Sequence, residues 1–154
     1  MIVLCNVNAI DTTLAHLREA GSRNCEGIVL WLGRRTPSAI HVEAVYRPAH
    51  VAREDMFHIP PASMTALQAE LRQRRLMVAA QVHSHPLEAF HSRADDQWAI
   101  IRHEGALSLV IPYFASQTTT GTFLKDAKVY QFSANAKWTE VPSKEVSSSW
   151  LQIK

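Results

Sequence analysis

The sequence has few cysteines, no long apolar run and no excess of charge. Its 154 residues include only two cysteines, too few for a disulfide framework and without CxxC spacing. The opening MIVLCNVNAIDTT is apolar only at its start and has no basic region, so it predicts neither a signal peptide nor a membrane span. We therefore expect a cytoplasmic protein with reduced thiols, with a single bridge between Cys5 and Cys25 as the alternative.

Charge and hydrophobicity indicate one ordinary globular domain. The 16 basic and 14 acidic residues give a formal net charge of +2, and the one basic block, RQRR at 72–75, is typical of the solvated end of a helix. We expect no binding to nucleic acid. A hydrophobic content of 47% suffices for a single core, and there is no internal repeat. Residues 1–154 are expected to form one domain, with a core at about 10–133 and a C-terminal extension at about 134–154.

Apolar runs and alternating patterns predict a mixed β-sheet flanked by helices, an α/β fold. The expected helices begin after Asp11, after Ser63 and at residue 92, and they end near Gly21, 75 and 103. The tail after residue 133 docks a last strand or helix, or extends to bind a partner; the pattern leaves both open. The expected strands lie at 2–4, 27–32, 39–47, 56–59, 76–82, 106–114 and 127–133, the second and third forming a hairpin.

Two histidines at the end of the central apolar run form a candidate metal site. His83 and His85 stand at i and i+2 of a strand, so both point to one face with Cα atoms about 7 Å apart. Pro86 stops the strand, and Asp95 or Asp96 then offers a third ligand. Five other histidines lack ligand-like spacing and are expected to be ordinary surface or core residues: His41, His50, His58, His91 and His103.

Two acidic residues that could serve this site have alternative interpretations. Residues 92–95, SRAD, fit a capping box in which Ser92 and Asp95 bond each other's backbone, and such a turn also holds a carboxylate firmly enough to ligate a metal. Glu26 precedes the strand at 27–32, where an acid is commonly solvated surface. It becomes a candidate general base if that strand lies beside the histidine strand.

These residues together resemble the JAMM (MPN+) family of zinc isopeptidases. The family pattern is a glutamate seven residues before the glycine that closes an apolar strand, then HSHP or HTHP, then SxxD at a helix start. Here Glu26 stands seven before Gly33, HSHP occupies 83–86 and SRAD occupies 92–95. The resemblance covers roughly residues 10–115 and implies the single-domain MPN fold, which is cytidine-deaminase-like.

The resemblance also implies the roles of the site residues. One zinc ion per chain is expected on His83, His85 and Asp95, with Glu26 as the general base and Ser92 as a hydrogen-bond donor to the oxyanion. Such a site hydrolyses an amide or isopeptide bond. From the strand pattern, Ser84 points away from the histidines and is expected to hold the turn through a backbone hydrogen bond.

The spacing departs from the common family pattern in one respect. Many members place seven residues between the second histidine and the serine, whereas six separate His85 from Ser92. The usual spacing would select Asp96 as the ligand and put Arg93 in place of the serine. The SxxD alignment selects Asp95, which we prefer because it preserves the serine.

The short loop at 86–91 resembles that of compact bacterial members of the family. This likeness implies that the partners are a ubiquitin-like protein and its conjugates, with E1-like and E2-like proteins of an antiviral defence operon. The substrate tail is expected to pair with a sheet edge at 47–61. Alternatives are a peptidase that processes a precursor or a sulfur-carrier protein, and a non-catalytic MPN scaffold.

Two other metalloenzyme classes fit poorly. Phosphoesterases that begin with HxH place it near the N-terminus and need many later ligands, which this chain lacks. A zinc peptidase of the HExxH type is excluded at His103, because Leu107 occupies the position of the second histidine.

Overall fold

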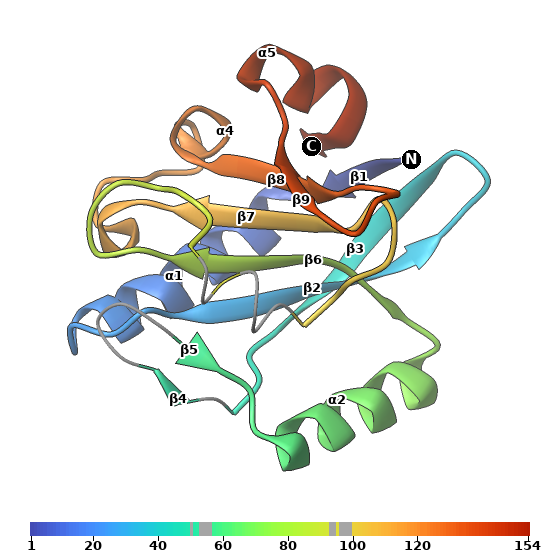
Figure 1. Ribbon diagram of the computed structural model, residues 1–154, viewed down its shortest axis with the longest axis horizontal. Coiled ribbons are helices and arrows are strands. Elements are labelled where there is room, and N and C mark those ends of the chain that lie inside the picture. Colours follow the sequence, from blue (N-terminus) through green and yellow to red (C-terminus); the bar gives the residue numbers. More distant parts are fainter. Residues whose placement is uncertain (50, 53–56, 93–94, 96–99) are drawn as a thin grey trace.

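The computed structural model describes residues 1–49, 51–52, 57–92, 95 and 100–154, and these form a curved sheet with helices on both faces (Figure 1). The strands are β1 (Ile2–Cys5), β2 (Ile28–Arg35), β3 (Ala39–Tyr46), β4 (Val51–Ala52), β5 (Phe57–His58), β6 (Met77–Ser84), β7 (Leu107–Ile111), β8 (Lys128–Phe132), β9 (Trp138–Glu140) and β10 (Leu151–Ile153). The helices are α1 (Val7–Gly21), α2 (Pro61–Arg74), α4 (Phe123–Asp126) and α5 (Ser143–Glu145), with single turns η1 (Tyr113–Ala115) and η2 (Val146–Trp150).

The main sheet is mixed, as the sequence predicts. Its eight described strands lie in the order β10-β1-β3-β2-β6-β7-β8-β9, while β4 and β5 form a separate two-stranded ribbon. β1 is parallel to both β3 and β10, and β6 is parallel to β7, whereas the other neighbours are antiparallel. The expected α/β fold is confirmed, and β6 occupies an interior position with strands on both sides.

Helix α1 covers one face of the sheet and lies behind it in the view of Figure 1. Its buried residues Ile10, Leu14 and Leu17 recur at helical spacing and pack against β2 and β6. The helix begins earlier than Asp11, because the Asn6 side chain accepts a hydrogen bond from the backbone N–H of Ala9 at 2.8 Å. The predicted cap was therefore wrong by about one turn, and the earlier start brings Ile10 into the core.

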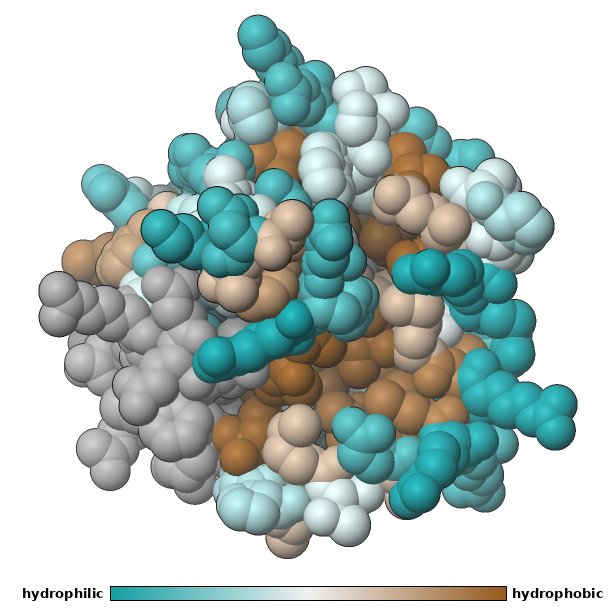
Figure 2. All heavy atoms as spheres, turned by 45° about the vertical axis from the view of Figure 1, so that its right-hand side comes forward, coloured by the Kyte–Doolittle hydropathy of each residue, from teal (hydrophilic) through white to brown (hydrophobic). Residues whose placement is uncertain are grey.

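Helix α2 packs on the opposite face through Leu67, which contacts a second apolar cluster containing Leu30 and Leu32 of β2. The helix begins at Pro61 rather than after Ser63, because proline at the first helical position is already set to a helical φ. A hollow of about 660 Å³ lies between α2 and the sheet. Figure 2 shows apolar side chains gathered there.

The hairpin of β2 and β3 is confirmed as antiparallel, with a register shift at Gly33. A Cβ atom at Gly33 would lie 2.6 Å from the His41 carbonyl oxygen, so only glycine allows the two backbones this approach. Six consecutive buried residues open β2, as expected for a strand covered on both faces. In the sequence, a strand that is covered on both faces consists of consecutive apolar residues.

Half of the expected helix at 92–103 lies outside the described residues. Asp95 is helical, whereas 100–103 are not, so that helix does not reach residue 103. The expected short strand at 56–59 is described only as β5, which pairs with β4. Cys5 and Cys25 are both free thiols, which removes the alternative of a bridge.

The C-terminal tail is built into the sheet. β9 pairs with β8, and β10 pairs with β1 at the far edge, joining Leu151 to Val3. Val141 and Val146, between these strands, are buried in the same core cluster as α1. The sequence left open whether the tail docks on the domain or extends to bind a partner, and the structure shows that it docks on the sheet. Within the described parts of the chain, no helix is both long and apolar enough to cross a membrane.

Candidate metal centre

The two histidines of the HSHP motif lie at the end of β6. His83 is the register partner of Ile28 on β2 and of Val110 on β7, so its backbone is fixed from both sides. His85 follows the strand, and its backbone N–H donates to the Ile111 carbonyl at 2.9 Å. Both histidines are buried, with exposed fractions of 0% and 3%. The sheet therefore fixes where both imidazoles can lie.

Glu26 is held beside the histidine strand through the residue that follows it. The Gly27 N–H donates to the Ser84 hydroxyl at 2.9 Å, and the Ser84 N–H donates to the Gly27 carbonyl at 3.0 Å. This contact joins residues 57 positions apart and gives Ser84 the backbone hydrogen bond expected of it. Glu26 is 1% exposed, and its Oε1 lies 4.0 Å from His85 Nε2. The interpretation of Glu26 as solvated surface is therefore wrong.

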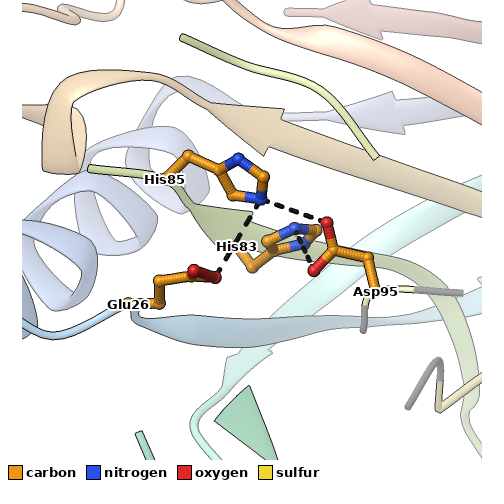
Figure 3. Close-up of side chains that lie close together, drawn as sticks. All are labelled: Glu26, His83, His85 and Asp95. Carbon is orange, nitrogen blue, oxygen red and sulfur yellow. Dashed lines mark hydrogen bonds and ion pairs between the residues drawn. The ribbon is translucent and has the colours of Figure 1, made fainter. Parts of the chain in front are cut away.

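Asp95 reaches both histidines from a separate segment. Its Oδ1 lies 3.1 Å from His83 Nε2, and its Oδ2 lies 3.1 Å from His85 Nε2 (Figure 3). The Ser92 N–H donates to Asp95 Oδ2 at 2.8 Å, and the Asp95 N–H donates to the Ser92 hydroxyl at 3.0 Å. The capping box is thus present, and it presents the carboxylate to the histidines. The alternative ligand Asp96 lies outside the described residues.

The four residues form a set that fits a metal ion. Ligand atoms from Glu26, His83, His85 and Asp95 all lie within 4.8 Å of one another, and all four side chains are buried. Two atoms bonded to one tetrahedral ion at 2.0–2.2 Å lie roughly 3.3–3.6 Å apart. The two histidine–Asp95 spacings are close to this value, whereas the 4.0 Å from Glu26 to His85 exceeds it.

The electrostatics keep the Asp95 carboxyl ionised. Burial alone raises its pKa, but the charge of His83 and the hydrogen bonds from His83, His85 and the Ser92 backbone outweigh burial. The pKa of Asp95 is therefore held well below its ordinary value. An anionic oxygen facing two imidazole nitrogens is a donor set that binds divalent transition metals.

Two aromatic neighbours of the site belong to none of its sequence motifs. The Phe90 ring packs edge-on against His85 with centroids 4.6 Å apart, although Phe90 is 54% exposed. His91, expected to be an ordinary histidine, lies with its ring centroid 6.1 Å from that of His83. Only their positions between HSHP and SRAD pointed to the site.

Comparison with known proteins gives the family. A family model described as prokaryotic homologues of the JAB domain matches residues 7–119. The chain belongs to this JAB family. The "Probable metalloprotease y4jG" of Sinorhizobium fredii (strain NBRC 101917 / NGR234) is 34% identical over 140 residues, which cover 88% of this chain and 85% of that protein. The predicted membership of the JAMM/MPN family is thereby confirmed.

A solved structure has the same fold as this chain. The solution structure of protein DSY2949 from Desulfitobacterium hafniense matches with a TM-score of 0.71 and 22% identity, over 100% of this chain and 93% of the other. At this identity the likeness concerns the fold alone. The structural match extends over the C-terminal strands, which lie beyond the residues that the family model matches.

Proposed function

We propose that this JAB protein is a zinc-dependent isopeptidase that hydrolyses the bond after the C-terminus of a ubiquitin-like protein. The observation that carries the proposal is the buried Glu26 carboxylate beside the set formed by His83, His85 and Asp95. Membership of the JAB family and the 34% identity to a protein named a probable metalloprotease support hydrolysis. A scaffold that only binds partners would not need this set of four buried groups.

The three ligands in this proposal are His83, His85 and Asp95. Two imidazoles and one carboxylate are the protein ligands of several catalytic zinc sites, which keep a fourth position open. A bound zinc ion would supply an acidified water and a polarised carbonyl. Glu26 stays outside the ligand set because its oxygen lies 4.0 Å from His85 Nε2.

Glu26 is the general base in this proposal. Its carboxylate takes the proton of the attacking water and passes it to the leaving amine, which for an isopeptide is a lysine side chain. Gly27 is hydrogen-bonded to Ser84, so the neighbouring Glu26 carboxylate keeps its place beside the histidine strand during both proton transfers. Burial at 1% exposure excludes bulk water that would compete for the proton.

Ser92 is the proposed oxyanion donor. In the capping box its oxygen accepts the Asp95 N–H, a contact that does not use the hydroxyl hydrogen. That hydrogen can therefore be donated to the oxygen of the scissile carbonyl as negative charge develops there. One well-placed donor of this kind contributes about 3 to 4 kcal/mol to transition-state stabilisation.

Exposed apolar side chains beside the centre support a protein substrate. Leu87, Phe90 and Tyr113 are 69%, 54% and 39% exposed. Phe90 packs on His85, and the N–H of Phe114, the residue after Tyr113, donates to the His85 carbonyl at 2.7 Å. Leu87 lies beside Tyr113, because the Tyr113 N–H donates to its carbonyl at 2.9 Å. An apolar rim of this kind is common where a macromolecule docks. We further propose that the substrate tail adds as a strand near 47–61, of which β4 and β5 are described.

Cleavage of defined substrates tests the proposal. A candidate ubiquitin-like protein is prepared in three forms: joined through an isopeptide bond to a lysine peptide, extended by a C-terminal peptide, and extended by one cysteine. The zinc-loaded protein is incubated with each, and mass spectrometry locates the cut, with a chelator as the control. We expect cleavage of the isopeptide after the C-terminal residue of the ubiquitin-like protein.

The other outcomes discriminate between the alternatives. Cleavage of only the peptide extension assigns precursor processing, and release of only the cysteine assigns sulfur-carrier processing. No cleavage of any form by protein that holds one zinc per chain would reject hydrolysis and favour the scaffold. Neighbouring genes for E1-like and E2-like proteins would identify which ubiquitin-like protein to use.

A further inference from the structure

We infer that His91, Ser108 and Gln81 form a positioning network that sets where the Asp95 carboxylate lies relative to the two histidines. The inference rests on the proposed metal site and assigns these three residues a role in metal affinity. None of the three is a ligand in that proposal. Their effect reaches Asp95 through His91, which directly precedes Ser92 of the capping box.

The network begins on the face of the sheet that carries His83. Gln81 stands two residues before His83 on β6, so both side chains point to the same face. Ser108 is the register partner of Gln81 on β7, and the Gln81 Nε2–H donates to its hydroxyl at 3.0 Å. Both residues are fully buried, with exposed fractions of 0%.

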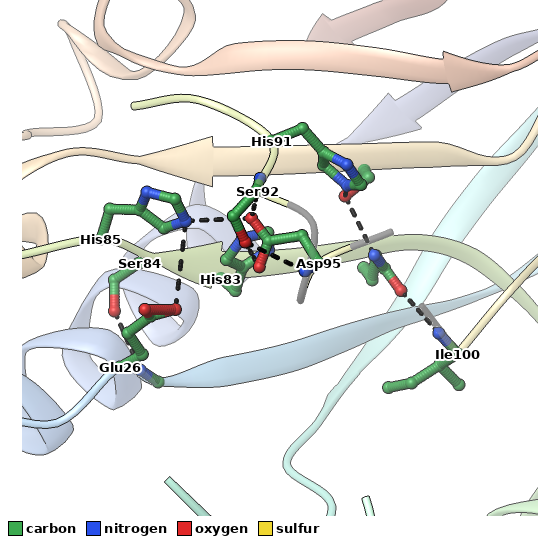
Figure 4. A network of polar contacts seen from close by, with 11 residues as sticks. Glu26, His83, Ser84, His85, His91, Ser92, Asp95 and Ile100 are labelled. Atoms are coloured by element: carbon green, nitrogen blue, oxygen red, sulfur yellow. Dashed lines mark hydrogen bonds and ion pairs between the residues drawn. The ribbon is translucent and has the colours of Figure 1, made fainter. Parts of the chain in front are cut away.

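Two bonds from this pair reach the chain on either side of Asp95. The Ile100 N–H donates to Gln81 Oε1 at 3.0 Å, and His91 Nε2 lies 3.1 Å from the Ser108 hydroxyl. Figure 4 shows this line of contacts running from His91 to Ile100. Asp95 lies between these two anchors in the chain. The sheet therefore holds His91 and Ile100, the two described residues that make these bonds.

Ring packing fixes the orientation of the His91 imidazole. Its centroid lies 5.0 Å from that of Tyr130 and 5.2 Å from that of Trp138, two residues of the adjoining strands β8 and β9. The aromatic contacts hold the ring where its Nε2 meets Ser108. His91 immediately precedes Ser92, whose backbone N–H bonds Asp95, so the anchor acts one residue from the capping box.

The cost of burying these polar groups indicates a specific role. A buried amide or hydroxyl is unfavourable relative to an apolar side chain unless its hydrogen bonds are made. The run from Met77 to Ala80 is otherwise apolar, so an apolar residue at position 81 would suit the interior equally well. What an apolar residue cannot do is accept the Ile100 N–H. Groups that orient metal ligands in this way typically contribute 10- to 100-fold to metal affinity.

The test compares Ser108→Thr with Ser108→Val. The two new side chains have nearly the same shape, and only threonine keeps the hydroxyl. Zinc affinity is measured by competition with a chromophoric chelator, the absorption spectrum of cobalt(II) reports ligand geometry, and melting of the metal-free protein reports the fold. We expect the valine variant to bind zinc about 10-fold more weakly than the threonine variant and to show an altered cobalt spectrum.

A second pair of variants covers the amide. Gln81→Met removes both of its hydrogen bonds at similar volume, and we expect a 10- to 100-fold loss of zinc affinity. Gln131→Met is the matched control, because Gln131 is a strand glutamine whose register partner is Leu107, on the opposite face. We expect it to bind zinc as the wild type does.

The outcomes separate this inference from the proposed function. The inference is overturned if the wild type binds one zinc, Ser108→Thr and Ser108→Val have equal zinc affinity, and Gln81→Met binds zinc as tightly as Gln131→Met. The network would then not position the ligand. If the wild type itself binds no zinc or cobalt, the proposed metal site fails first.

Discussion

Replacing Glu26 by glutamine separates metal binding from proton transfer. The exchange keeps the shape of a side chain that is 1% exposed, so it creates no cavity in the site. It also removes one of two buried carboxylates whose oxygen atoms lie within 4.8 Å of each other. We therefore expect the melting temperature of the metal-free Glu26→Gln protein to be unchanged or higher.

The expected loss of activity follows from the chemistry of the exchanged group. A glutamine amide can accept a hydrogen bond but cannot take the proton at neutral pH, so the general-base contribution is lost. Such contributions are about 100- to 10,000-fold in rate, which is about 2.7 to 5.4 kcal/mol of activation free energy. Metal binding should persist, because Glu26 Oε1 lies 4.0 Å from His85 Nε2, farther than two ligands of one tetrahedral ion lie from each other.

The assay measures turnover on the isopeptide substrate and zinc content on the same preparation. Glu88→Gln serves as the control, because Glu88 is an exposed glutamate three residues after His85 and undergoes the same chemical change. We expect one zinc per chain in both variants and loss of turnover only in Glu26→Gln. If Glu26→Gln turns over within about tenfold of the wild type at equal zinc content, the assignment of Glu26 as the base is refuted. If Glu26→Gln loses the zinc, Glu26 is a ligand instead.

Further expectations concern the third ligand, a buried hydrogen bond and the thiols. Asp95→Asn should lose more zinc than Asp96→Asn in equilibrium dialysis, and the reverse order would move the ligand to Asp96. In the metal-free protein, the ionised Asp95 stabilises the fold fully above the unfolded-state pKa of about 4. This stabilisation is lost as the pH falls through the lower folded-state pKa of Asp95. Between pH 6 and pH 3, the urea midpoint of Asp95→Asn should therefore fall less than that of the wild type. Ser84→Ala leaves a buried N–H without its acceptor and should reduce the free energy of unfolding by about 1 to 3 kcal/mol, measured by urea denaturation. Burial raises the pKa of the Cys5 thiol to about 12, so iodoacetamide should label the half-buried Cys25 and leave Cys5 unmodified in folded protein, as peptide mapping would show.

Local patterns in the sequence were sufficient to predict most elements of the fold. Interior strands such as β6 show as continuous apolar runs, and the α1 stripe of Leu14 and Leu17 shows as helical spacing. Helix starts were less predictable, because several residues near a helix start can serve as its cap and tertiary packing selects one. Asn6 rather than Asp11 caps α1 for this reason.

The sequence by itself determined the chemistry of the site: the residue types, their order, and the strand period that turns His83 and His85 to one side. Only the tertiary structure decided which distant groups join them. Gly27 meets Ser84 across 57 residues, and Gln81 meets Ser108 across 27, because the registers of β2, β6 and β7 align them. Register depends on contacts between strands remote in the chain, so no local pattern specifies it.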